Sequence, residues 1–277
     1  MSTKSSLLLA TLAAASLSVS SAQAQIVTLT DGNSSASVNF GSQAGMYAWN
    51  VNNVNQLNQQ WFWYRIDGDP TGQHSIDTIG APVVNSGVNQ VTATYTDGSF
   101  SLALTYQLSG GLPGGQDGSS DITESITIRN ITSSPLTFHF FQYSDFMLGG
   151  TQGGETASIF QNGGSFSQAT VTKGGSKISE TVDQPMANGA EADLATATRN
   201  HLNQGSPYNL NGNLNSGPDP SLDATWALQW DFTIAGNGSA DVLKDKHLDV
   251  GPVPEPGVFS LLGLGLAAMV VRRNRLS

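Results

Sequence analysis

Large apolar side chains alternate with polar ones along most of the chain, and this period of two is typical of β-strands that bury one face. The clearest run covers residues 100–108, where every even position is large and apolar. Residues 91–95 show the same alternation, and Asp97-Gly98 lies between the two runs. This dipeptide accepts the positive φ angles of a type I′ turn. The pattern therefore predicts a β-hairpin in which the even-numbered side chains of residues 100–108 enter the core.

Two further segments predict strands, one of them central in its sheet. Residues 138–143 carry aromatic side chains on both faces, which indicates a central strand covered by a second layer. Residues 226–234 carry Trp, Leu, Trp, Phe and Ile at alternate positions. Many short strands separated by Gly, Asn and Ser turns are typical of a β-sandwich. We therefore expect an all-β fold, a large antiparallel β-sandwich in residues 25–250.

Helical patterns are weak in this part of the chain. Residues 187–202 have the alanines and acidic residues of a short helix, and residues 203–220 have the composition of a long loop. We expect one short helix followed by that loop.

Glu124 interrupts an apolar face, because it has the same parity as Ile122, Ile126 and Ile128. A carboxylate on such a face needs a partner or a shifted pKa, which makes it a candidate for acid–base chemistry. A position at a sheet edge, with access to water, is the plainer expectation.

The first 24 residues contain the parts of a secretory signal peptide in their usual order. Lys4 precedes an apolar core, and Ala22 and Ala24 form an A-x-A cleavage site in front of Gln25. We expect an N-terminal signal helix in residues 1–24, cleavage before Gln25, and export of the body.

A second apolar segment lies near the C-terminus. Residues 257–271 contain no charged side chain, and Arg272, Arg273 and Arg275 follow them. At about 1.5 Å per residue the run reaches roughly 22 Å, which is short for a hydrocarbon core of about 30 Å. Because cationic residues resist translocation, the arginines should stay in the cytoplasm and the body outside. This predicts a short C-terminal transmembrane helix.

The end of the chain resembles a known sorting signal. Val253, Pro254, Glu255 and Pro256 precede the apolar span, and the arginines follow it. In this order, residues 251–277 resemble the PEP-CTERM sorting signal of Gram-negative and related bacteria. The resemblance implies that exosortase, a membrane cysteine protease, cuts near the Pro-Glu-Pro. It also implies transient anchoring at the inner membrane, followed by a place at the cell surface or in the extracellular matrix.

The body itself offers a less specific resemblance. The motifs WFWYRI and FHFFQYSDF resemble an uncharacterised extracellular domain found in proteins with this tail. Bodies attached to the tail are otherwise unrelated, so this second resemblance assigns no site residue.

The composition of the body excludes several classes of function. Without Lys4 and the tail arginines, 7 of the 11 Lys and Arg residues remain, and without Glu255, 20 of the 21 Asp and Glu residues remain. Such an acidic body disfavours nucleic acid as a partner and suits solubility or cation binding. The chain has no Cys, which excludes disulfides, thiolate catalysis and zinc–thiolate sites.

The densest group of carboxylates lies in the turn-rich stretch DGDPTGQHSID, which contains Asp67, Asp69 and Asp77. Calcium binds several oxygen ligands from flexible loops, so these residues are a candidate calcium site. Ordinary turn chemistry is the alternative, because the EF-hand spacing is absent. No other cofactor is expected.

Trp49, Trp61 and Trp63 are candidate glycan contacts. Trp61 and Trp63 share one face of an extended segment, and Trp49 has neighbouring Asn side chains. Exposed aromatic faces can stack on sugar rings, whereas buried ones fill a sandwich. Burial is the favoured expectation for the cluster around Trp61.

Catalytic patterns are sparse. The sequence contains no G-x-S-x-G and no H-E-x-x-H motif, and its four histidines are scattered. His139 and Asp145 share a strand face, but six residues separate them by about 20 Å. A polysaccharide-degrading site would need His139, Glu124 and either Arg129 or Arg199 in one cleft.

We therefore expect a protein that is not an enzyme. It is predicted to be an exported surface or matrix protein, processed by an exosortase-like protease, with a structural or adhesive body. A module that binds extracellular polysaccharide is the alternative, and a polysaccharide-degrading enzyme is less favoured.

Overall fold

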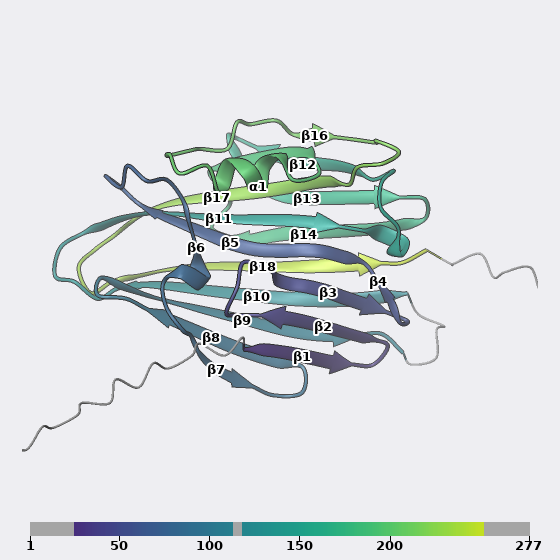
Figure 1. The fold of residues 1–277 in the computed structure, drawn as a ribbon, viewed down its shortest axis with the longest axis horizontal. Helices are drawn as coiled ribbons and strands as arrows, with labels where there is room; N and C mark the ends of the chain where they lie inside the picture. Colours follow the sequence, from purple (N-terminus) through teal and green to yellow (C-terminus); the bar gives the residue numbers. More distant parts are fainter. Residues whose placement is uncertain (1–24, 113–117, 252–277) are drawn as a thin grey trace, which may run out of the picture.

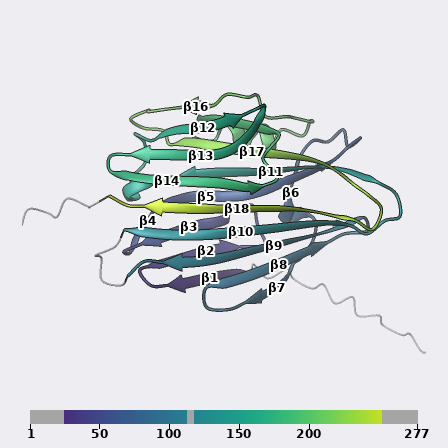
Figure 2. The same cartoon turned by 180° about the vertical axis from the view of Figure 1, so that it is seen from behind.

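Two large sheets pack face to face to form the body (Figure 1). The computed structural model describes residues 25–112 and 118–251. Figure 1 looks onto the first sheet, and Figure 2, from behind, looks onto the second. The described residues thus form an all-β sandwich, which confirms the fold class predicted from the alternating pattern.

The first sheet contains nine strands, and all their pairings are antiparallel except a short parallel one between β3 and β5. In spatial order its main path is β1 (Ile26–Asp31), β2 (Ser34–Asn39), β3 (Gly45–Val51), β5 (Leu57–Ile66), β11 (Leu136–Phe146), β17 (Ala224–Ile234) and β15 (Gly189–Leu194). In addition, β4 (Val54–Asn55) pairs with β3, and β6 (His74–Ser75) pairs with β5.

The second sheet also contains nine strands, all paired antiparallel. Its spatial order is β16 (Asn215–Ser216), β12 (Thr156–Asn162), β13 (Ser165–Lys173), β14 (Ser176–Gln184), β18 (Ser239–Asp249), β10 (Ser119–Asn130), β9 (Phe100–Gly110), β8 (Gln90–Thr96) and β7 (Val83–Ser86).

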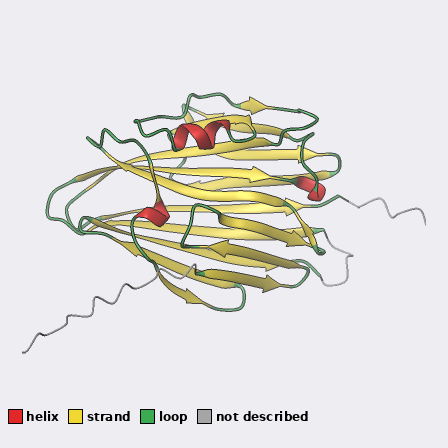
Figure 3. Cartoon of the chain, in the orientation of Figure 1, coloured by secondary structure: helices red, strands yellow, loops and turns green. Residues whose placement is uncertain are grey.

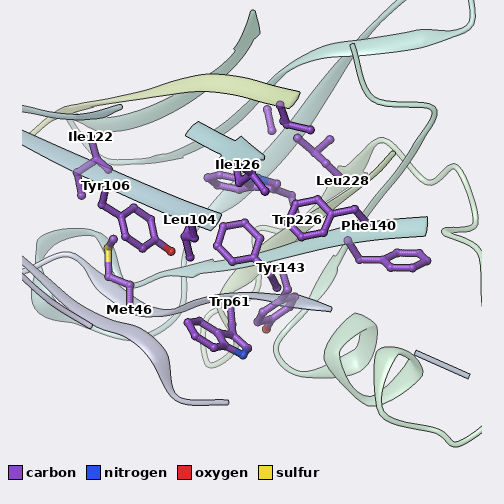
Figure 4. Close-up of a cluster of buried hydrophobic side chains, with 14 of the residues drawn as sticks. Met46, Trp61, Leu104, Tyr106, Ile122, Ile126, Phe140, Tyr143, Trp226 and Leu228 are labelled. Atoms are coloured by element: carbon purple, nitrogen blue, oxygen red, sulfur yellow. The ribbon is translucent and has the colours of Figure 1, made fainter. Parts of the chain in front are cut away.

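The inward faces of the two sheets share one apolar core. Figure 4 shows part of it, together with Trp61 and Tyr143 on the outward face of the first sheet. Leu104 and Ile126 enter it from the second sheet, and Phe140 and Trp226 from the first. Phe62 stacks on Phe140 with ring centroids 5.3 Å apart. Because each fully buried side chain of this size contributes about 1.5–3 kcal/mol, apolar burial is the main force between the sheets.

The predicted hairpin is present, but its turn differs from the expectation. β8 pairs with β9, with Val91 opposite Tyr106. Neither Asp97 nor Gly98 has a positive φ angle, so the type I′ turn was a wrong prediction. Instead, the Asp97 carboxylate accepts the backbone N–H groups of Ser99 and Phe100 at 2.6 and 2.9 Å. A side-chain acceptor closes this turn without left-handed backbone geometry.

The predicted central strand is confirmed. β11 lies between β5 and β17 in the first sheet. Phe140 on its inward face and Phe141 and Tyr143 on its outward face are all buried. Both faces of this strand are therefore covered.

The short helix expected within residues 187–202 occupies only the end of this stretch. Only α1 (Ala197–Leu202) is helical, whereas residues 189–194 form β15 and pair with β17. Ala190 and Ala192 enter the core from β15. Pairing with a neighbouring strand thus overrides the helical preference of this alanine-rich stretch.

Helical structure is limited to short pieces (Figure 3). Besides α1, the described residues contain the 3-10 turns η1 (Ile76–Thr78) and η2 (Leu148–Gly150). Within residues 25–112 and 118–251, no helix is long and apolar enough to cross a membrane. The predicted signal helix and C-terminal transmembrane helix lie outside these ranges.

Candidate functional site

A cluster of four buried charged side chains lies between the sheets, and we call Glu124, Glu180, Lys244 and Lys246 the charge cluster. All four come from the second sheet, and none is more than 1% exposed. Strand pairing sets Glu124 opposite Lys244 and Glu180 opposite Lys246. Each carboxylate therefore has a lysine as its neighbour on the adjacent strand.

Hydrogen bonds join these charges to one another. The Lys244 Nζ donates to Glu124 Oε2, and the Lys246 Nζ donates to Glu124 Oε1. Glu180 has one oxygen 3.4 Å from Lys244 Nζ and the other 3.3 Å from Lys246 Nζ. Two cations thus face two anions in a site closed to water. Such mutual compensation is what makes buried charges tolerable.

The first sheet supplies the remaining partners of the cluster. Gln142 on β11 accepts a hydrogen bond from Lys244 and donates one to Glu180 at 2.6 Å. Gln60 on β5 donates to Glu124 at 3.4 Å. Lys244 Nζ also lies 5.0 Å from the centre of the Phe62 ring, within the range of a cation–π contact. The cluster therefore ties the two sheets together through polar contacts.

Burial and the opposite charges nearby shift the pKa values of these groups in opposite directions. Burial raises the pKa of Glu180, but Lys244 and Lys246 outweigh it and the pKa is lowered overall. Burial lowers the pKa of Lys244 more than Glu124 and Glu180 raise it. For Lys246 the two carboxylates prevail over burial, and its pKa is raised. Lys244 is accordingly the lysine that gives up its proton more readily.

Sequence reasoning found only one member of this cluster. It singled out Glu124 correctly by its parity but expected an edge position with access to water, which is wrong because β10 lies between β9 and β18. The same parity test would have found the others. Lys244 and Lys246 have the same parity as the apolar Val242 and Leu248, and Glu180 has the same parity as Ile178 and Val182.

Polar side chains on the outer face of the first sheet hold a covering segment, residues 195–211. The Arg65 guanidinium donates to the Tyr208 carbonyl at 3.1 Å and to Asn209 Oδ1 at 2.9 Å. Gln229 donates to Asn209 at 3.2 Å and accepts the backbone N–H of Leu210 at 3.1 Å. Arg65 on β5 and Gln229 on β17 thus bind this segment to the outer face of the sheet.

Glu191 anchors the same segment from β15. Its buried carboxylate accepts hydrogen bonds from the Thr198 hydroxyl at 2.6 Å and the Asn211 backbone at 3.0 Å, and also from the Tyr208 hydroxyl. His201 Nδ1 lies 3.6 Å away. Burial, followed by the hydrogen bond to Glu191, raises the pKa of Tyr208. The hydrogen bonds of the Glu191 carboxylate thus attach α1 and the loop after it to β15.

Part of the outer face remains open to solvent around His139 and Asp231. The two side chains lie opposite each other on β11 and β17, with His139 Nδ1 2.6 Å from Asp231 Oδ1. Their exposed fractions are 15% and 41%. Burial raises the pKa of Asp231, but hydrogen bonds from His139 and Gln229 prevail and lower it overall.

The constellation considered for polysaccharide degradation is not assembled. His139 lies on the outer face of the first sheet, beside Asp231. Glu124 lies between the sheets, bonded to the inward-facing Gln60. Arg199 donates to Gln59 on the outer face, and Arg129 is exposed on β10. The first sheet itself thus separates the histidine from Glu124.

Asp145, near the end of β11, is a buried carboxyl group with incomplete hydrogen bonding. Asn58 and the Tyr143 hydroxyl donate to Oδ2 at 3.0 and 3.2 Å, whereas Oδ1 has no partner among the described residues. Burial raises the pKa of Asp145 most, and the negative charge of Asp223 raises it further. The pKa reaches about 7, although the hydrogen bonds from Asn58 and Tyr143 lower it.

The tryptophans proposed as glycan contacts are all completely buried. Each indole N–H group donates a hydrogen bond within the protein. Trp49 donates to Ser120 at 2.9 Å, Trp61 donates to Ser75 at 2.8 Å, and Trp63 donates to Asn203 at 3.0 Å. No ring face is open to a sugar. Burial, the favoured expectation for the cluster around Trp61, is therefore what the structure shows, and Trp49 is buried as well. They fill the protein interior and satisfy their polar atoms internally.

The candidate calcium ligands do not converge. Asp69 accepts hydrogen bonds from Thr71 and lies 2.8 Å from His74, whereas Asp77 accepts hydrogen bonds from Ser75 and Trp61. Asp67 is exposed. In residues 25–112 and 118–251, no group of three or more His, Asp or Glu side chains could hold a metal ion. Asp69 and Asp77 accept hydrogen bonds from protein groups instead.

The residues predicted for processing lie almost entirely outside the described part of the chain. Of the signal cleavage site only Gln25 is described, and its carbonyl accepts the backbone N–H of Phe40 at 3.1 Å. Ala22 and Ala24 precede the first described range. The sorting residues follow the second one: Val253, Pro254, Glu255, Pro256, Arg272, Arg273 and Arg275.

Comparison with solved structures identifies the class of fold. A bacterial glucoamylase complexed with acarbose aligns over 84% of this chain and 33% of its own, at 8% identity and a TM-score of 0.54. Slr1438 from Synechocystis sp. PCC 6803 aligns over 83% of this chain and 97% of its own, at 10% identity and a TM-score of 0.51. The chain thus spans about a third of the glucoamylase, and at these identities the likeness concerns the fold alone.

The C-terminal sequence supplies the more specific assignment. Residues 252–275 match the PEP-CTERM protein-sorting motif, so the chain carries this sorting signal behind a β-rich body. The signal implies export, processing by exosortase, which is a membrane protein, and a surface or extracellular location. No curated protein matches the chain in sequence.

Loss of one charge from the cluster should destabilise the fold strongly. We expect Lys246→Met to lower the free energy of unfolding by about 3–5 kcal/mol, because it leaves a buried carboxylate uncompensated. Lys177→Met, on an exposed position of β14, is the matched control and should change it by less than about 0.5 kcal/mol. Urea unfolding followed by tryptophan fluorescence measures both, and equal midpoints would contradict the role given to the cluster.

Asp145 should make stability depend on pH. Its pKa is about 7 in the folded protein and about 3.9 in an unfolded chain. The folded state therefore keeps a proton that the unfolded state loses, and stability falls as the pH rises from about 4 to 7, by at most about 4 kcal/mol.

Asp145→Asn should flatten this fall and make the protein more stable than the wild type at pH 8. The measurement is urea unfolding at a series of pH values, with Asp241→Asn on the exposed face of β18 as control. Identical pH profiles for Asp145→Asn and the wild type would rule out the raised pKa.

Proposed function

We propose that the protein is held transiently at the inner membrane by residues 257–271 and is then cut near Pro254, Glu255 and Pro256. The body thereafter serves a structural or adhesive role at the cell surface or in the extracellular matrix, and it is not an enzyme. The sorting motif at residues 252–275 is the observation that carries the proposal. Bodies with this tail share a route of export, so the role of the body needs its own support.

The use of polar side chains in the body supports a structural role. The charge cluster holds the two sheets together, and Arg65 and Glu191 hold the covering segment. These side chains are the kinds that an active site would employ, yet each is occupied by contacts within the protein. Internal pairing of the buried lysines and glutamates, in a body without cysteine, suits persistence outside the cell.

Binding of extracellular polysaccharide is the second candidate, and the open part of the outer face favours it. His139, Asp231 and Asn188 combine donors and acceptors there, and sugar hydroxyl groups need both. The glucoamylase of similar fold was solved with acarbose, which supports this candidate by analogy of fold alone.

Replacing Pro254, Glu255 and Pro256 together by Ala should block processing. We expect the uncut precursor to accumulate in the membrane fraction of its own host and the released body to fall at least tenfold. Immunoblotting of membrane and medium fractions, with an antibody against the body, measures both. Normal release of this triple variant would overturn the sorting proposal.

Polysaccharide binding should depend on the open patch. In native gels containing the host's extracellular polysaccharide, we expect the wild-type body to be retarded. Asp231→Asn should bind about tenfold more weakly, equivalent to about 1.4 kcal/mol. Asp241→Asn, which makes the same change in charge on the other sheet, should behave as the wild type. A wild-type protein that migrates equally with and without polysaccharide would exclude this candidate.

A further inference from the structure

Lys244 and Gln142 bring an amine against a side-chain amide in the middle of the sandwich. Lys244 extends from β18 of the second sheet, and Gln142 from β11 of the first. Both residues are completely buried, and the Lys244 Nζ donates a hydrogen bond to the Gln142 Oε1. The nucleophilic nitrogen is therefore held beside a carbonyl group on the opposite sheet.

The surrounding carboxylates are placed to move protons. Glu124 accepts a hydrogen bond from the same Lys244 Nζ, so it can take up the proton that makes the amine nucleophilic. Glu180 accepts a hydrogen bond from the Gln142 Nε2 at 2.6 Å and has its other oxygen 3.4 Å from Lys244 Nζ. Glu180 thus hydrogen-bonds the leaving nitrogen, and its second oxygen, which makes no hydrogen bond among the described residues, lies within ion-pair distance of the attacking nitrogen. A carboxylate between the two nitrogens can carry a proton from one to the other.

We infer that Lys244 and Gln142 form an isopeptide bond that links the two sheets covalently. The Lys244 ammonium first passes one proton to Glu124. The neutral Nζ then attacks the Gln142 Cδ, and Glu180 carries a proton from Nζ to Nε2. The Cδ–Nε2 bond breaks, one ammonia molecule leaves, and an Nζ–Cδ amide remains. No oxidant or further reactant is consumed.

The neighbourhood favours this reaction at Lys244 rather than at Lys246. Burial lowers the pKa of Lys244, whereas the two carboxylates raise that of Lys246. Among the described residues, the hydrogen bonds of Lys246 reach only a carboxylate. The fold holds the nucleophile and the carbonyl group in place, so the reaction avoids the entropy loss of a bimolecular encounter. This positioning can greatly accelerate even the slow reaction of an amine with an amide.

The bond would give a cysteine-free protein a covalent cross-link of the kind that disulfides provide elsewhere. It joins residues 142 and 244 and restricts the unfolded chain between them. The inference is independent of where the protein is sorted or what it binds, since the bond can be detected in the body itself.

Peptide mapping of the mature protein from its own host tests the inference. After denaturation and complete trypsin digestion, we expect residues 130–173 to be joined to residues 200–246, with cleavage after Lys244 blocked. This branched peptide should weigh one ammonia less than its two parts. Intact mass alone is insufficient, because cyclisation of an N-terminal Gln25 loses ammonia too. Full recovery of the linear peptides 130–173 and 200–244 would overturn the inference.

Variants separate the chemistry from the fold. Lys244→Arg should abolish the branched peptide, and Lys246→Arg, the matched control, should retain it. Gln142→Glu should give a branched peptide lighter by one water instead of one ammonia, because a carboxyl group replaces the amide. A branch at Lys246, or a branch unchanged in Lys244→Arg, would overturn the assignment. The wild-type digest decides the matter even if a variant does not fold.

Discussion

Two lysines and two glutamates in an apolar interior can exist only if they compensate one another, and this constraint fixes how the sheets align. Glu124, Glu180, Lys244 and Lys246 meet only in the observed register of β10, β14 and β18. A slip of one residue would turn each charge to the outer face and break every pair. Amides from the first sheet complete the cluster, so the same constraint also sets the position of that sheet. Apolar burial supplies the energy, and the charges select the alignment.

The polar side chains on the two faces of the first sheet therefore make different kinds of contact. Its inward amides, Gln60 and Gln142, satisfy the charge cluster, whereas outward side chains such as Arg65 hold the covering segment. Strand alternation makes this separation possible, because neighbouring residues of one strand point to opposite sides. It also explains why His139 and Glu124 cannot cooperate, although both are residues of catalytic type. The patch around His139 and Asp231, on the outer face, combines polar side chains with access to solvent.

Much of the fold could be predicted from the sequence, because a period of two is a local signal. The strand at residues 100–108 and the central strand at 138–143 followed from it directly. β15 could not be recognised, since its alanine-rich sequence also suits a helix and only pairing with β17 decides between them. Parity identified Glu124 as unusual, but its partners lie about 60 and 120 residues away in the chain. Burial of the tryptophans likewise depends on which segments cover them, which no local pattern reveals.

The presence of the charge cluster is not explained by stability alone. Buried ion pairs can often be replaced by well-packed apolar side chains with little loss, or with a gain, in stability. An apolar replacement would, however, lose two things that the observed residues provide. The first is a register that only one alignment satisfies. The second is an amine held against an amide between two carboxylates, as Lys244 is held against Gln142. Register selection within the second sheet needs only the paired charges. Gln142 comes from the first sheet, and the contact of its amide with the Lys244 amine is the feature that we connect with covalent chemistry.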